Sequence, residues 1–98
     1  MPVAVSIYLE NGAHERVARV GDDLDESFLS ACQAAPDGSV MSGVFSVGDT
    51  MFNEQQLEQF ARELDQLPEE RKTGTTRQVA DMARRAAALR GYLFISGD

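Results

Sequence analysis

Nearly every local signal for the start of a helix is present in Gly48-Asp49-Thr50-Met51-Phe52-Asn53-Glu54-Gln55-Gln56-Leu57. Asn53 is a preferred N-cap residue, because its side-chain oxygen accepts a hydrogen bond from a free amide of the first turn. Gln56, three residues later, can accept from the Asn53 amide in return and close a capping box. Phe52 and Leu57 stand at the two ends of a hydrophobic staple. The stretch therefore predicts a helix that begins directly after Asn53.

Apolar residues continue at helical spacing over residues 54–67, and the same spacing returns over residues 76–90. Pro68 limits the first of these helices. We expect Thr75 or Thr76 to cap the second and Gly91 to follow it in the left-handed conformation.

A shorter helix is expected after Gly21. Asp23 and Glu26 have the spacing of an N-cap and its third helical residue. The apolar stripe that identifies this helix consists of Leu24, Phe28, Leu29 and Cys32.

Four segments have the composition of strands. Residues 3–9 are rich in β-branched and aromatic side chains, and Val3, Val5, Ile7 and Leu9 fall on one face. Asn11-Gly12 favours a tight hairpin turn into an edge strand over residues 14–20. Residues 39–47 are a weaker strand candidate. Residues 92–95 form a continuous apolar run, which is typical of a central buried strand.

Together these elements predict an α+β fold with the order β-β-α-β-α-α-β. We expect a small, mainly antiparallel sheet and three helices, two of them forming an antiparallel pair packed on one face of the sheet. A chain of 98 residues has room for one hydrophobic core, so residues 1–98 are expected to form a single domain.

The net charge of -7 is unevenly distributed along the chain. Residues 1–70 carry a net charge of -11 and residues 71–98 a net charge of +4. An acidic surface disfavours nucleic acid and anionic membranes as partners and favours a basic protein, although charge also keeps small proteins soluble. With a single cysteine and no long apolar run, the sequence predicts a cytoplasmic protein.

Two acidic segments are the first candidates for a partner-binding surface. They lie within residues 22–26 and 63–70, and their candidate residues are Asp22, Asp23, Asp25, Glu26, Asp65, Glu69 and Glu70.

Three Gly-Asp pairs offer a weak alternative, a metal site formed by Asp22, Asp49 and Asp98. Each pair is expected just after a strand, so the three carboxylates could gather at the strand ends and hold Mg²⁺ or Ca²⁺. Gly-Asp is also ordinary turn chemistry, which explains the pairs without a metal.

Catalytic residues are not evident. Ser46 lacks the upstream glycine of a nucleophile elbow, and His14 is the only histidine that could act as its base. Cys32 lies on an apolar stripe, where a cysteine is usually a small core residue. We therefore expect no enzymatic activity and no cofactor.

Arginines recur on the predicted helix over residues 76–90, opposite the acidic preceding helix. Complementary solvated faces of a helical pair explain this pattern, with Asp81 spaced to pair with Arg77 and Arg85. An anion-binding or RNA-binding role is the alternative, but the helix lacks interleaved aromatic residues.

The N-terminal hairpin, the segment Asp49-Thr50-Met51-Phe52-Asn53 and the closing Tyr92-Leu93-Phe94-Ile95-Ser96-Gly97-Asp98 resemble a group of small uncharacterised proteins from Streptomyces and related actinobacteria. The resemblance covers most of the chain and implies no activity.

The leading functional hypothesis is a non-enzymatic, acidic protein-binding module, such as an immunity or antitoxin-like partner of a basic toxin. One alternative is a small enzyme or metal-binding protein that uses the strand-end carboxylates. Another is a homo-oligomeric structural protein that pairs through an exposed strand edge.

Overall fold

The computed structural model describes residues 5–45 and 47–97, and these residues form four strands and three α-helices. The strands are β1 (Val5–Glu10), β2 (Arg16–Gly21), β3 (Gly48–Phe52) and β4 (Tyr92–Gly97). The helices are α1 (Ser27–Gln33), α2 (Glu54–Asp65) and α3 (Gly74–Ala88), with short 3₁₀ helices η1 (Met41–Gly43) and η2 (Glu69–Arg71). The α+β class and the order of elements are as predicted.

The strands form one sheet in the order β2-β1-β4-β3, and all three neighbouring pairs are antiparallel. The prediction that residues 92–95 form a central strand is confirmed, because β4 pairs with β1 on one side and with β3 on the other. β2 is an edge strand, also as predicted.

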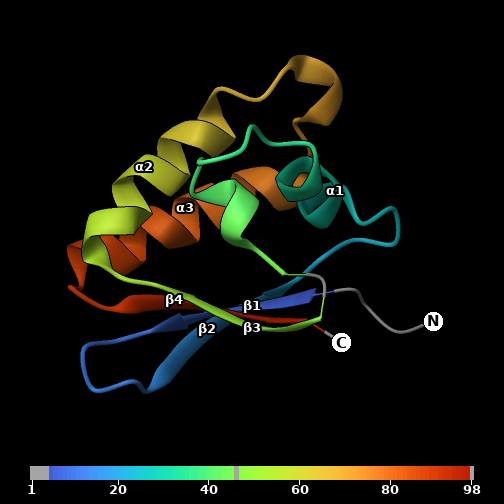
Figure 1. The fold of residues 1–98 in the computed structure, drawn as a ribbon. Helices are drawn as coiled ribbons and strands as arrows, with labels where there is room; N and C mark the ends of the chain where they lie inside the picture. Colours follow the sequence, from blue (N-terminus) through green and yellow to red (C-terminus); the bar gives the residue numbers. More distant parts are fainter. Residues whose placement is uncertain (1–4, 46, 98) are drawn as a thin grey trace.

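All three helices lie on one side of the sheet, and α2 and α3 run side by side in opposite directions (Figure 1). Alternate side chains of β1 and β4 point into the space between the layers, where they are fully covered. The largest buried side chains come from both layers and include Ile7, Leu9, Leu93 and Ile95 of the sheet and Phe28, Leu57, Phe60 and Val79 of the helices. Among the described residues, no helix covers the opposite face of the sheet.

The third strand lies at residues 48–52, so its prediction over residues 39–47 is wrong. Residues 41–43 instead form η1, and the buried residues Met41 and Val44 are three apart, the spacing of a helical turn. Glu63 of α2 holds this turn, because its two carboxylate oxygens accept hydrogen bonds from the Val40 and Met41 amides at 3.0 and 2.8 Å. The strand instead consists of the residues just before Asn53, a stretch in which the sequence shows mainly the signals of a helix start.

The hairpin between β1 and β2 has a longer connection than the predicted two-residue turn. The side chain of Asn11 accepts hydrogen bonds from the amides of Ala13 and Glu15, and the left-handed residue is His14 rather than Gly12. A side-chain hydrogen bond of this kind replaces the backbone turn that Asn-Gly would otherwise form. β2 consequently starts at Arg16, two residues later than expected.

The predicted capping box of α2 is confirmed. The Asn53 side chain accepts from the Gln56 amide at 3.2 Å, and the Gln56 side chain accepts from the Asn53 amide at 3.0 Å. Phe52 and Leu57 are both buried, and the Phe52 ring packs on Phe60 with 4.9 Å between ring centroids. The staple of Phe52 and Leu57 fixes the angle at which the chain passes from β3 into α2.

The ends of α3 differ from the prediction by a few residues. Thr73, not Thr75 or Thr76, is the N-cap, and Thr76 completes a capping box with it. At the other end Arg90, with φ of 53°, occupies the left-handed position that was expected for Gly91. Gly91 serves a different purpose, because a Cβ at this position would overlap the carbonyl oxygen of Glu10.

Within the described residues, no helix is long and apolar enough to cross a bilayer.

Candidate functional site

The acidic segment 22–26 starts helix α1, and its residues divide into buried and exposed ones. Asp22 is only 6% exposed. Its carboxylate accepts from the amides of Asp23, Phe28 and Leu29 at 2.9, 3.1 and 3.0 Å. The carboxylate satisfies amides of the first helical turn and places a negative charge at the positive end of the helix dipole.

Asp23 also accepts hydrogen bonds at the start of α1. It accepts from the Ser27 amide at 2.8 Å and from the Ser27 hydroxyl. Desolvation opposes ionisation of the Asp23 carboxyl, but hydrogen bonds from Ser27, Thr75 and the Asp25 amide together outweigh it and lower the pKa. The N-cap position itself is Glu26, in a left-handed conformation, so the predicted cap with Asp23 at that position is wrong. Leu24 is 91% exposed and does not belong to the apolar stripe.

The other predicted partner-binding residues remain on the surface. Asp65 forms an ion pair with Arg84 across the two long helices, and Glu69 lies 3.8 Å from Lys72. Asp25 and Glu70, which come from the two different acidic segments, line the same shallow hollow of about 140 Å³ near the start of α1. Asp25 and Glu70 of the predicted acidic surface therefore lie close together, whereas Asp22 is buried and does not belong to that surface.

Asp22 and Asp49, two of the three predicted metal candidates, are not gathered at one point of the sheet. Gly21, which precedes Asp22, lies at one end of a row that crosses all four strands and ends at Asp49. Three strand spacings of about 4.8 Å separate the ends of this row by roughly 14 Å. Asp98 lies outside the described residues. Within residues 5–45 and 47–97, no three His, Cys or acidic side chains are grouped closely enough to hold a metal ion.

Ser46 and Cys32 were the other residues considered for catalysis. Ser46 lies outside the described residues. Cys32 is buried in the core, and desolvation raises the pKa of its thiol, as do the carboxylates of Asp22 and Glu63. A buried thiol with a raised pKa is a poor nucleophile.

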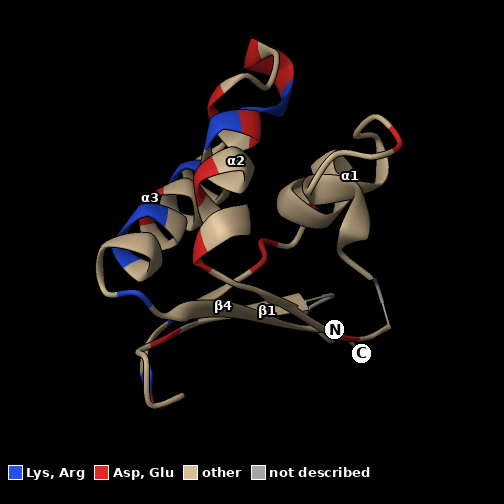
Figure 2. Ribbon diagram, turned by 60° about the vertical axis from the view of Figure 1, so that its left-hand side comes forward, with Lys and Arg blue, Asp and Glu red and all other residues tan. Residues whose placement is uncertain are grey.

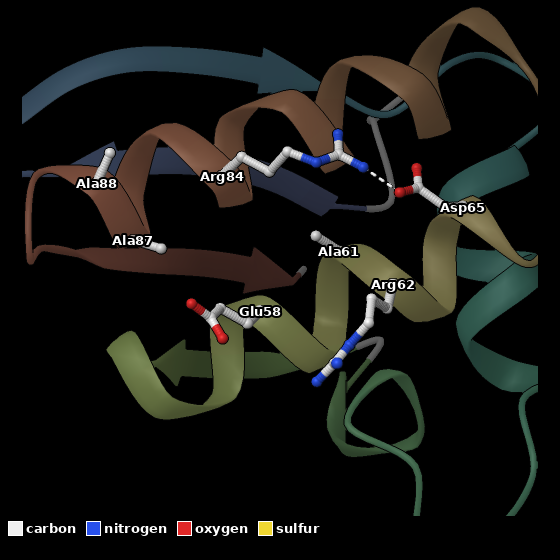
Figure 3. Close-up of a pocket in the computed structure, with 7 residues that line it drawn as sticks. All are labelled: Glu58, Ala61, Arg62, Asp65, Arg84, Ala87 and Ala88. Carbon is white, nitrogen blue, oxygen red and sulfur yellow. Dashed lines mark hydrogen bonds and ion pairs between the residues drawn. The ribbon is translucent and has the colours of Figure 1, made fainter.

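A shallow groove of about 470 Å³ lies between α2 and α3 (Figure 3). Its lining combines small and charged side chains, namely Glu58, Ala61, Arg62, Asp65, Arg84, Ala87 and Ala88. The Asp65–Arg84 pair bridges the helices, and Arg84 also lies 3.2 Å from Asp81. The predicted complementary helix faces are therefore present, although Asp81 pairs with Arg84 rather than with Arg77 or Arg85.

The helix-free side of the sheet, which we call the outer face, carries a cluster that the sequence did not reveal. Tyr8 of β1 and Phe94 of β4 are opposite each other in the sheet, with 6.3 Å between their ring centroids. The Arg16 guanidinium lies 3.9 Å from the Tyr8 ring centroid and 5.3 Å from that of Phe94. Arg19 approaches Tyr8 at 5.9 Å and donates a hydrogen bond to the Ser6 hydroxyl. The half-buried aromatic rings are thus framed by two cations.

The cluster continues toward the hairpin loop. The rings of His14 and Tyr92 stack with 4.3 Å between centroids and an interplanar angle of 14°. Glu10, only 6% exposed, has one carboxylate oxygen 3.1 Å from His14 Nδ1 and the other 3.9 Å from Arg16 Nε. At the opposite side of the face, Met51 of β3 lies opposite Phe94 and is 44% exposed.

The outer face was not predicted because residues 92–95 form a continuous apolar run. This run predicted burial on both faces, but only Leu93 and Ile95 are fully covered, whereas Tyr92 and Phe94 are half-buried on the outer face. The available signal was the alternation in β1, where Ser6 and Tyr8 separate the buried residues. Only the register of β1 and β4 shows that Tyr8 and Phe94 lie opposite each other.

Acidic and basic residues are concentrated on the helical layer, whereas β1 and β4 are almost free of them (Figure 2). The outer face combines aromatic side chains with two arginines, Arg16 and Arg19, and two carboxylates, Glu10 and Asp49.

A comparison with protein-family models, curated proteins and solved structures gives no significant match for this chain.

Proposed function

We propose that this protein is a non-enzymatic binding module that contacts a protein partner through the outer face of its sheet. The observation that carries the proposal is the composition of that face. Tyrosine, phenylalanine, methionine and arginine are the residue types enriched at protein–protein interfaces. Here they lie side by side on one helix-free surface, as Tyr8, Tyr92, Phe94, Met51 and Arg16.

The packing of the face also favours binding. Arg16 is held over two aromatic rings and close to Glu10, and His14 is stacked on Tyr92. Side chains that are ordered before binding lose less conformational entropy when a partner arrives. The face therefore presents its contact groups in a prearranged form.

The net charge of -7 indicates the chemistry of the partner. An acidic protein attracts a basic one over distances near the Debye length and thereby raises the association rate. We therefore propose a partner with a net positive charge. A small inhibitor of a basic toxin, of the immunity or antitoxin type, fits this combination. In this proposal the outer face supplies the contact, and Asp25, Glu26, Glu69 and Glu70 supply long-range attraction.

Affinity capture from the native host, with three variants beside the wild type, tests this division of roles. The first variant, Tyr8→Ser with Phe94→Ser, removes aromatic contacts from the outer face. The second, Leu24→Ser with Leu89→Ser, is its matched control, because it removes exposed apolar side chains from the helical side. The third replaces Asp25, Glu26, Glu69 and Glu70 by their amides.

We expect the wild type and the control to capture the same protein, and the outer-face variant to lose it. The amide variant should still capture it, but more weakly at low salt, because it loses attraction rather than contact. Circular dichroism must show that each variant remains folded. Capture that survives in the outer-face variant and disappears in the amide variant would assign the contact to the acidic residues instead. Recovery of no protein partner at either low or high salt would contradict the protein-binding function.

A further inference from the structure

The two edges of the sheet differ in how well they are protected. β2 carries Arg16 and Arg19, and its pairing with β1 contains a bulge between Leu9 and Glu10. Charges and bulges are the usual devices that prevent an edge strand from pairing with another chain. β2 is therefore an edge strand that is protected from pairing with another chain.

The β3 edge has little such protection. Of its five residues only Asp49 is charged, and Met51 is 44% exposed. Two apolar residues just before the strand are more exposed still, Phe45 at 61% and Val47 at 72%. Within residues 5–45 and 47–97, β3 pairs with β4 and with no other strand. An edge strand of this kind presents unpaired N–H and C=O groups beside apolar side chains.

We propose that β3 pairs antiparallel with β3 of a second copy of this chain, so that the two sheets join into one of eight strands. A two-fold axis that passes between Thr50 of one copy and Thr50 of the other gives the register that pairs all five residues. Gly48 then lies opposite Phe52 of the other copy, and Asp49 opposite Met51. No like charges face each other, which suits the strand to a partner identical to itself.

The side chains agree with this register. Directly opposite residues of an antiparallel pair project to the same side of the sheet. Asp49 and Met51 are both exposed and lie two residues apart, so both project from the outer face. The joined sheet would therefore have one continuous outer face.

The contact is expected to be reversible and dependent on salt. Two five-residue strands bury much less than the roughly 1,200–2,000 Å² of a standard stable interface. Each copy also carries a net charge of -7, so the copies repel each other over long distances. Added salt screens this repulsion, so it should strengthen the pairing.

Sedimentation velocity on the purified protein tests the proposal with five proteins. They are the wild type, Met51→Glu, Met51→Lys, the double variant Asp49→Lys with Met51→Glu, and the outer-face variant Tyr8→Ser with Phe94→Ser. Met51→Glu places a carboxylate opposite Asp49, whereas Met51→Lys places an opposite charge there. The double variant reverses the charge at position 49 and so restores attraction. Concentrations should run from about 10 μM to about 1 mM, at low and high salt.

The expected results follow from these charges. The wild type should form more dimer as its concentration rises, and the Kd of dimerisation should fall with added salt. Met51→Glu should raise that Kd by about tenfold or more, which corresponds to about 1.4 kcal/mol. Met51→Lys should dimerise at least as well as the wild type, and the double variant should recover most of the loss. Because the substituted side chains are exposed, the Tm of each variant should remain close to that of the wild type.

Three results would overturn the proposal. One is a wild-type protein that stays monomeric at every concentration. Another is equal weakening by Met51→Glu and Met51→Lys, which would contradict the register. The third is a dimer that tolerates Met51→Glu but disappears in the Tyr8→Ser, Phe94→Ser variant, which would move the contact to the outer face. Pairing of β3 is independent of partner capture, so each proposal can fail without the other.

Discussion

The carboxylate of Asp22 faces the first turn of α1 and accepts hydrogen bonds from the Phe28 and Leu29 amides of that turn, and from the Asp23 amide before it. From the sequence, the same residue was a candidate both for partner binding and for a metal site. Asp49, which shares its Gly-Asp context, is exposed at the far edge of the sheet. Residue type and local context therefore predict turn chemistry at both positions, but not which carboxylate becomes buried.

Replacing Asp22 by alanine should lower the free energy of unfolding by about 2–4 kcal/mol, because buried amides would lose their acceptor. Urea denaturation followed by circular dichroism measures this loss. Asp49→Ala is the matched control and should change the free energy by less than about 0.5 kcal/mol. Equal effects of the two substitutions would contradict the capping role of Asp22.

Asp23 predicts a dependence of stability on pH. Its pKa in the folded protein is lowered from the ordinary value of 3.8, so the ionised form is favoured by folding. The stabilisation is therefore fully present above pH 3.8 and is lost as the pH falls through the lowered folded pKa. Asp23→Asn should be less stable than the wild type near neutral pH, and the difference should shrink in acid. Urea denaturation at a series of pH values checks this, and a difference that grows in acid would contradict it.

At the scale of elements, the C-terminus of α3 shows how a correct signal can be assigned to the wrong residue. The helix ends with hydrogen bonds from the Gly91 amide to the Ala86 carbonyl and from the Arg90 amide to the Ala87 carbonyl. This is the Schellman arrangement, in which Arg90 takes the left-handed position usually given to glycine. Gly91 instead allows β4 to approach the end of β1 closely.

Two neighbouring substitutions should therefore have opposite effects. Arg90→Gly removes the cost of a left-handed non-glycine residue and should raise the free energy of unfolding by up to about 1 kcal/mol. Gly91→Ala should lower it by more than about 1 kcal/mol, because the new Cβ overlaps backbone atoms that cannot move freely. Thermal denaturation of both variants measures the signs, and a stabilised Gly91→Ala protein would contradict the close approach.

The elements that were predicted correctly are those whose signals are local. The capping box at Asn53 and Gln56 depends on residues three apart, and it is found as expected. η1 and β3 could not be predicted in this way. Glu63, which holds η1, is more than twenty residues away from the amides that it binds. The outer face likewise depends on the pairing of Tyr8 with Phe94, which only the folded sheet brings together.

At the scale of the whole molecule, β4 joins the two parts of the sheet. It pairs with β1 along its whole length and with β3 on its other side. Leu93 and Ile95 are completely buried between the sheet and the helices. Each fully buried side chain of this size contributes on the order of 1.5–3 kcal/mol before entropy is counted.

Deletion of residues 92–98 should abolish cooperative unfolding, because it removes a central strand and part of the core. Thermal denaturation followed by circular dichroism measures the sharpness of the transition. Tyr92→Thr with Phe94→Thr is the control, since it changes only outer-face side chains and should leave a sharp transition. A truncated chain that still melts sharply would show that the core does not depend on β4.

The pairing of β1 with β4 also determines how the chain reaches its fold. Ile7 and Ile95 are directly opposite each other, although almost the whole chain separates them. The hairpin of β1 and β2 and the pair of α2 and α3 join segments that are close in sequence, so they can form early. Bringing β4 to β1 closes a very long loop, and contacts of this kind slow folding. Until that closure occurs, one edge of β1 has no strand beside it, and in this interval the chain is most prone to associate with other chains.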